Sequence, residues 1–83
     1  MLIVIVTGAS KGVGRAVAKA LLDAGAYVAC VARSKVMLDS LVKYYPSQAF
    51  AFAYDLSDPD EINICFKKVF QKDKYLFIND IDY

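Results

Sequence analysis

The fold of this chain is decided by the stretch LIVIVTGASKGVGR, residues 2–15. Its first five residues are all large and apolar, which is typical of a strand buried on both faces of a parallel sheet. Glycines follow at positions 8, 12 and 14, and apolar residues then recur at helical spacing from Val13 onward. We therefore predict a strand, a glycine turn and the beginning of a helix.

Such a turn predicts a phosphate site. The first turn of a helix has N–H groups without intrahelical partners, and the helix dipole places positive charge there. Glycines let the backbone approach a pyrophosphate closely and adopt positive φ. The candidate ligand residues are those of the turn: Gly8, Ser10, Lys11, Gly12, Val13 and Gly14. No Gly-Lys-Ser/Thr follows, so the turn is not a P-loop; an ordinary strand–helix turn is the alternative.

The rest of the chain alternates between short apolar runs and helical patterns. Further strands are predicted at residues 27–32, 49–54 and 75–78. The first helix should end at Gly25. Within it the apolar residues recur at helical spacing, at Val13, Val17, Leu21 and Ala24, which predicts an apolar row along the helix.

Two more helices are predicted from their starting signals. Ser34 can cap a helix whose inner face is Leu38, Leu41, Val42 and Tyr45. Asp58 can cap a helix that begins at Pro59, with Glu61 completing a capping box.

The element order is therefore βαβαβαβ, an α/β chain of the Rossmann type. Right-handed crossovers place the strands in the order 3-2-1-4 in one parallel sheet. With 83 residues, we expect a single dinucleotide-binding domain over residues 1–83.

Composition excludes several classes of function. The net charge of +1 gives no case for nucleic-acid binding, although residues 1–45 carry six basic against two acidic residues and residues 46–83 four against seven. Without histidine, Cys–His catalysis and histidine metal sites are excluded. Cys30 and Cys65 lie in apolar segments and should be buried, reduced thiols. Because the apolar runs are too short to cross a membrane, we expect a cytoplasmic protein.

The end of the second predicted strand indicates which dinucleotide fits. An acidic residue about 20 positions beyond the glycine turn holds the ribose 2′-OH of NAD. Here Arg33 and Ser34 occupy that place. A guanidinium pairs with a 2′-phosphate, and Ser10, Lys11 and Ser34 can add donors and charge. The sequence thus favours NADP(H) over NAD(H), unless Arg33 is merely a solvated surface residue.

The pattern T-G-x-x-x-G-x-G, residues 7–14, resembles the cofactor-binding motif of the short-chain dehydrogenase/reductase family, and the likeness covers nearly the whole chain. Within the family, the chain is most similar to carbonyl and xylulose reductases. The resemblance implies NADP preference for Arg33 and adenine contacts for Asp55 and Leu56, although Asp55 could instead only shape a turn. The family's fourth strand ends in Asn-Asn-Ala-Gly; here Asn79 alone matches.

The resemblance also implies what the chain does not contain. The family's active site uses a serine and a Tyr-x-x-x-Lys pair, and none of these has a counterpart in the 83 residues. We therefore expect no catalytic residue, but the nucleotide-binding half of an NADP(H)-dependent oxidoreductase. The alternatives are a non-catalytic dinucleotide-binding or interaction module that self-associates through the edge of its fourth strand, and a vestigial truncated product.

Overall fold

Parallel strands form one sheet, with its first strand in the interior. The computed structural model describes residues 2–69 and 74–78. Within these residues the strands are β1 (Leu2–Thr7), β2 (Tyr27–Ala32), β3 (Ala49–Ala53) and β4 (Lys74–Ile78). They stand in the order β3-β2-β1-β4, and each neighbouring pair is parallel. The predicted fold class and strand order are confirmed.

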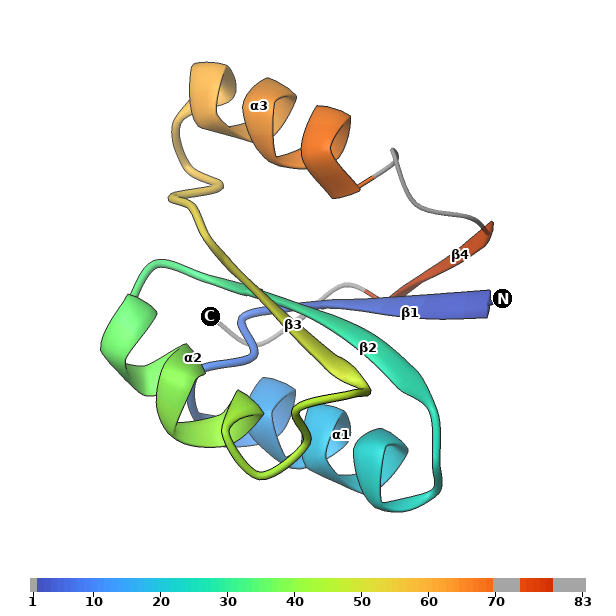
Figure 1. The fold of residues 1–83 in the computed structure, drawn as a ribbon. Coiled ribbons are helices and arrows are strands. Elements are labelled where there is room, and N and C mark those ends of the chain that lie inside the picture. The colour runs from blue at the N-terminus through green and yellow to red at the C-terminus, as the bar shows by residue number, and fades with distance from the viewer. Residues whose placement is uncertain (1, 70–73, 79–83) are drawn as a thin grey trace.

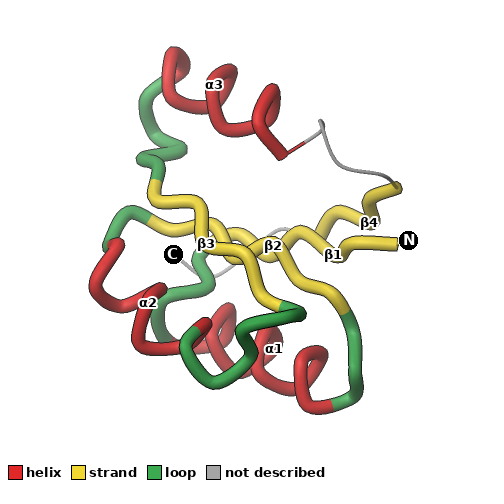
Figure 2. The backbone as a smooth tube through the Cα atoms, in the orientation of Figure 1, coloured by secondary structure: helices red, strands yellow, loops and turns green. Residues whose placement is uncertain are grey.

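The helices that connect these strands cover both faces of the sheet. They are α1 (Gly12–Asp23), α2 (Lys35–Val42) and α3 (Pro59–Val69). Figure 1 shows α1 and α2 on one face and α3 on the other, and the tube in Figure 2 shows the same layers. The chain therefore changes face after β3. None of the helices in the described part of the chain is long and apolar enough to cross a membrane.

Alternation along the central strands fills an apolar core on each face. From β1, Val4 and Val6 join the cluster under α1 and α2, while Ile3 and Ile5 join the cluster on the α3 side. All four side chains are buried. Two-sided burial explains why the sequence of β1 shows no polar alternation.

The buried face of α1 is not the predicted apolar row: its residues lie one position further along the helix. The buried residues of the helix are Gly14, Ala18 and Leu22. Val13 is 52% exposed and Ala24 is exposed too, so these two members of the predicted apolar row do not lie in the core. Val17 and Leu21 lie partly buried at the side of the cluster.

The cause of this rotation is the close packing of Gly14 against the glycine turn. A Cβ at Gly14 would lie 2.2 Å from the carbonyl oxygen of Gly8 and 3.2 Å from that of Thr7. Only glycine lets the helix approach the turn so closely. The row of residues that begins at Gly14 must therefore face the sheet.

The end of α1 and the beginning of α2 follow the predicted signals. Gly25 has a φ of 91°. Its N–H donates to the Leu22 carbonyl at 3.0 Å, and the Ala26 N–H donates to the Leu21 carbonyl at 3.0 Å, which is a Schellman ending. At α2, the Ser34 Oγ accepts from the Met37 N–H at 3.2 Å. The predicted inner residues of α2 are buried or half-buried in the first cluster: Leu38, Leu41, Val42 and Tyr45.

The predicted capping box of α3 is wrong. Asp58 does cap the helix, because its Oδ1 accepts from the Asp60 N–H at 2.9 Å. However, the Asp58 N–H already donates to the Asp55 carbonyl at 3.1 Å. The Glu61 carboxylate therefore accepts instead from the Asp55 N–H, at 3.0 Å. Glu61 thus fixes the turn after β3 rather than the N-cap residue.

The contact at Gly14 predicts how much stability the protein loses when one methyl group is added at this position. Gly14→Ala should lower the free energy of unfolding by about 3 kcal/mol, because the new Cβ overlaps backbone that cannot rotate away. Helix propensity alone would change stability in the opposite direction, by about 1 kcal/mol. The measurement is urea denaturation of both proteins.

Gly12→Ala is the matched control. Gly12 has a φ of 60° and nothing within 4 Å of an added Cβ. This variant should lose only about 1–2 kcal/mol, the cost of the left-handed backbone. If Gly14→Ala were no more destabilising than Gly12→Ala, the close approach would not limit the packing of α1.

Candidate functional site

The candidate site lies where the carboxyl ends of β1, β2 and β3 meet. Because these strands are parallel, the segments that follow them emerge at one edge of the sheet. The glycine turn follows β1, Arg33 and Ser34 follow β2, and residues 54–56 follow β3. The Ala9 N–H donates to the Val31 carbonyl at 3.1 Å, and the Tyr54 N–H donates to the Ala32 carbonyl at 2.9 Å. These hydrogen bonds hold the three segments together.

The glycine turn has the backbone of an anion site. Gly8 and Gly12 have φ values of 67° and 60°. Lys11 occupies the N-cap position of α1 in extended conformation, and its side chain makes no capping hydrogen bond. The first turn of the helix contains no acidic residue. The N–H groups at this end of α1 are therefore left for a ligand.

The residues predicted in this turn divide into two groups. Lys11, Gly12 and Val13 are exposed, while Gly8 and Ser10 are half-buried. Gly14, by contrast, is buried beneath the turn against Gly8. Gly14 therefore shapes the turn, and the other residues line its outer side.

Arg33 and Ser34 lie beside the turn at the end of β2. Arg33 is exposed, and its charge is one of the causes that lower the pKa of Asp55. The Ser34 Oγ is the helix cap, where it accepts a hydrogen bond. A hydroxyl that accepts through a lone pair keeps its O–H to donate.

Asp55 and Leu56 both have structural partners at the end of β3. The Asp55 Oδ1 accepts from the Ser57 N–H at 2.9 Å and from the Ser57 hydroxyl at 2.6 Å. These hydrogen bonds, with a smaller contribution from Arg33, lower the pKa of Asp55. Leu56 is half-buried against the core cluster on the α3 side. Asp55 thus shapes a turn, which the sequence offered as the alternative to a contact with adenine. Asn79, the remaining predicted residue, lies outside the described residues.

Arg15 is a neighbour of the site that sequence reasoning left without a role. Its Nη1 donates to the Met37 carbonyl in α2 at 3.1 Å and to the Ser10 carbonyl in the glycine turn at 3.5 Å. The only signal in the sequence is its position directly after Gly14, the third glycine of the motif.

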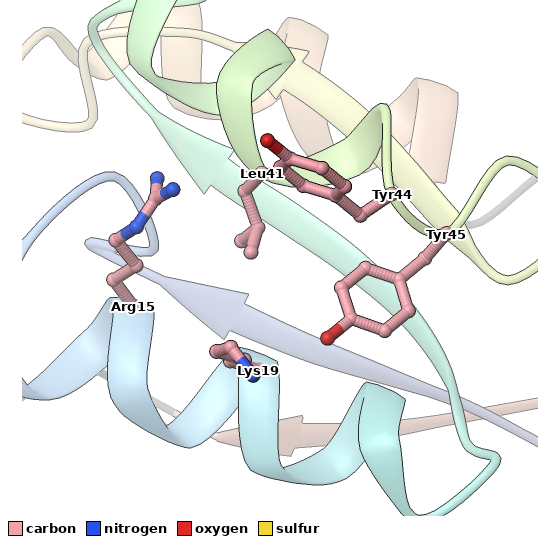
Figure 3. A pocket seen from close by; sticks show the side chains of 5 residues that line it. All are labelled: Arg15, Lys19, Leu41, Tyr44 and Tyr45. Atoms are coloured by element: carbon pink, nitrogen blue, oxygen red, sulfur yellow. The ribbon is translucent and has the colours of Figure 1, made fainter.

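A groove between α1 and α2 lies beside Arg15. It has a volume of about 440 Å³ and is lined by Arg15, Lys19, Leu41, Tyr44 and Tyr45, as Figure 3 shows. Asp23 accepts from the Tyr45 hydroxyl, and its carboxylate pairs with Lys19 at 2.9 Å. Tyr45 and then Lys19 lower the pKa of Asp23. These polar groups satisfy one another and connect α1 to the segment that follows α2.

The two thiols have no features of a nucleophile. Cys30 and Cys65 are free and fully buried, as predicted. Burial raises the pKa of Cys30 to about 11 and also raises the pKa of Cys65. Both stay protonated at neutral pH. Among the residues that the structure describes, no group of acidic or cysteine side chains could hold a metal ion.

Comparison with known proteins gives a consistent family. The family model described as short chain dehydrogenase matches residues 2–78. A short chain dehydrogenase of Pseudocercospora fijiensis is 49% identical over 59 residues, which are 68% of this chain and 19% of that protein. The L-xylulose reductase of Bos taurus is 55% identical over 42 residues, which are 51% of this chain and 17% of the reductase.

A solved structure agrees with the sequence comparison. The crystal structure of a short-chain dehydrogenase from Streptomyces avermitilis superimposes with a TM-score of 0.81 and 39% identity. The match covers 87% of this chain and 27% of the Streptomyces protein. The chain thus spans about a fifth of the length of the two curated relatives and about a quarter of this structure.

The hydrogen bonds to Asp55 predict a pH dependence. The ordinary pKa of 3.8 is lowered in the fold, so the turn of Asp55 and Ser57 is stabilising above that pH and is lost as the pH falls through the lower, folded pKa. Ser57→Ala removes the strongest cause and should raise the pKa of Asp55 toward 3.8. NMR titration of the carboxyl carbon measures this shift.

Ser47→Ala is the control for this titration, since Ser47 is an exposed serine in the loop between α2 and β3. It should leave the pKa of Asp55 unchanged. An unchanged pKa in Ser57→Ala as well would show that the hydroxyl contact is not formed in solution.

Proposed function

Because the chain belongs to the short chain dehydrogenase family, we propose that it binds NADP(H) in preference to NAD(H). In this proposal residues 1–83 are the nucleotide-binding part of an oxidoreductase that transfers hydride between the cofactor and a carbonyl or alcohol carbon. The bound cofactor supplies or accepts the hydride, and the residues of this chain bind and orient it.

The pyrophosphate fits the glycine turn. Positive φ at Gly8 and Gly12 turns the backbone at both ends of a short loop, and no side chain of the cap residue competes for the first N–H groups of α1. A negative ligand gains from the helix dipole at this end. The exposed Lys11 adds a positive charge on the same turn.

The observation that carries the choice of NADP(H) is the exposed guanidinium of Arg33 at the end of β2. Arginine pairs with a phosphate bidentately and never loses its charge at physiological pH. Neither Arg33 nor Ser34, the residues that follow β2, offers the carboxylate that would bind a ribose 2′-OH and repel a 2′-phosphate. In this proposal the adjacent Ser34, and Ser10 of the glycine turn, supply further hydroxyl donors.

Asp55 suits the adenine end of the same ligand. Its lowered pKa keeps the carboxylate ionised at neutral pH, and Oδ1 is the oxygen that the turn uses. A carboxylate has two acceptor oxygens, so Oδ2 can accept from an exocyclic amino group. Leu56 follows as an apolar neighbour for the ring, as the family resemblance implies.

The reaction class is proposed from the family and from relatives such as the L-xylulose reductase. No tyrosine of the 83 residues has a lysine four positions later. Binding of the dinucleotide is thus the activity that these residues themselves provide. Hydride transfer requires in addition an acid placed at the substrate oxygen.

The proposal predicts that Arg33→Asp weakens the binding of NADPH much more than the binding of NADH. Loss of a charge-assisted contact, with a carboxylate in its place, should raise the dissociation constant of NADPH by about 10- to 100-fold. The dissociation constant of NADH should change much less, because NADH has no 2′-phosphate. Calorimetric titration of the 83-residue chain with each cofactor, beside a thermal melt, measures both.

Lys35→Asp is a matched charge reversal two residues later. The Lys35 side chain is 76% exposed and pairs with Asp39 at 2.6 Å on the outer surface of α2. It should leave the ratio of the two dissociation constants unchanged. If Arg33→Asp lowered the affinities for NADPH and NADH equally, the 2′-phosphate assignment would be refuted. If the unsubstituted chain melted cooperatively but bound neither cofactor, the proposal itself would be refuted.

A further inference from the structure

Arg15 connects two elements that would bind different phosphates of the dinucleotide. From the first turns of α1, its Nη1 donates to the Met37 carbonyl at 3.1 Å and lies 3.5 Å from the Ser10 carbonyl. Ser10 belongs to the glycine turn, and Met37 to the first turn of α2. One guanidinium thus contacts backbone from two segments that are far apart in the sequence.

On the α2 side, the contact extends directly to the end of β2. The Met37 N–H donates to the Ser34 Oγ at 3.2 Å, and the Leu38 N–H donates to the Ser34 carbonyl at 3.0 Å. The peptide that Arg15 holds is therefore part of the same helical turn as Ser34. Arg33, which is proposed to bind the 2′-phosphate, is the next residue toward β2.

On the other side, Arg15 holds the turn that is proposed to bind the pyrophosphate. Ser10 follows Ala9, whose N–H is bonded to the Val31 carbonyl near the end of β2. This side of the turn is thereby fixed at Ala9 by the sheet and at Ser10 by Arg15. In Figure 3 the Arg15 side chain extends away from α1 along one side of the groove, to the left of Leu41 in this view.

The chemistry of arginine suits this bridging contact. A guanidinium has five N–H donors in a rigid plane and remains charged, so it can serve carbonyl oxygens of two segments at once. Arg15 is half-buried, between the glycine turn and the beginning of α2. Its hydrogen bonds to Ser10 and Met37 both go to backbone carbonyls, which distinguishes it from the exposed Arg33.

We propose that Arg15 is a positioning residue that fixes the glycine turn relative to the beginning of α2. The two phosphate subsites are then held at one separation, and a ligand with both phosphates binds to both without reorganising the protein. This inference rests on the proposed function. Its consequence is specific: loss of Arg15 removes the cooperation between the two subsites and leaves each subsite in place.

Four adenosine ligands measure this cooperation in a thermodynamic cycle. Adenosine, 5′-AMP, 2′-AMP and 2′,5′-ADP are titrated into the 83-residue chain. The cycle compares the gain in affinity from a 2′-phosphate with and without the 5′-phosphate. In Arg15→Met, the gain measured with the 5′-phosphate should fall by about fivefold, while the gain measured without it stays the same.

Two further variants test whether the effect comes from the contacts of Arg15 with both segments, here called the bridge, or from its positive charge alone. Lys19→Met removes a positive charge from the same face of α1 one turn later, where Lys19 pairs with Asp23, and should leave the cycle unchanged. Arg15→Lys keeps the charge but not the planar donors, and should resemble Arg15→Met. If Arg15→Lys bound like the unsubstituted chain, charge alone would explain the effect and the bridge would be refuted.

Amide hydrogen exchange tests the bridge without a ligand. In Arg15→Met, exchange should accelerate at Ala9, Met37 and Leu38, and stay unchanged at Gly25 and Ala26 in the Schellman ending. Acceleration at all five amides would indicate general destabilisation and refute a positioning role.

The binding outcomes separate this inference from the proposed function. A selective loss of cooperation in Arg15→Met supports both. If Arg15→Met lowers the affinity for all four ligands equally, or for none of them, the role of Arg15 is refuted and the proposed function still stands. If the unsubstituted chain melts cooperatively but binds neither 2′,5′-ADP nor NADPH, the proposed function fails, and the positioning role fails with it whatever the exchange pattern.

Discussion

The contact between Gly14 and the Gly8 carbonyl is the constraint on which the rest of the structure depends. A Cβ at this point would lie 2.2 Å from the oxygen, so the first turn of α1 is seated directly on the glycine turn. This contact fixes the rotation of α1 about its axis. Ala18 and Leu22, at four-residue intervals from Gly14, then face the sheet.

The same rotation places the neighbouring residues of α1. Successive residues of a helix are separated by about 100°, so the residues on either side of Gly14 leave the sheet in different directions. Val13 points toward solvent, and Arg15 reaches the carbonyl of Met37 in α2. A glycine buried beneath the turn thus determines where the residues around the proposed site point.

Much of the fold could be predicted from the sequence, because strand burial and helix punctuation are local signals. The Gly25 ending and the Ser34 cap follow from patterns a few residues long. The order of the four strands follows from the alternation of strands and helices together with the right-handed crossover rule. The inner face of α1 could not be predicted in the same way. Apolar spacing favoured the row through Val13, whereas the row that is buried begins at a glycine, which has no side chain to signal its position.

The residues of the candidate site also differ in whether the local sequence reveals their roles. The glycine turn, Arg33 and Asp55 are recognisable because each directly follows a predicted strand. Glu61 and Arg15 are not, since their partners are set by the geometry of the fold. Glu61 binds the Asp55 N–H because a turn already occupies the Asp58 N–H, and Arg15 bonds a carbonyl 22 residues away.

Several residues of the candidate site serve the fold with one atom and leave another for a ligand. The Ser34 Oγ accepts from the backbone of α2 and keeps its proton to donate, while Asp55 uses Oδ1 in its turn and retains a second oxygen. Such contacts hold a side chain in place before a ligand arrives, which reduces the entropy that binding must remove. Arg33, with its exposed guanidinium, stands apart from them. The proposed choice between the two dinucleotides therefore rests on an exposed side chain that makes none of these capping and turn hydrogen bonds, although its charge helps to lower the pKa of Asp55.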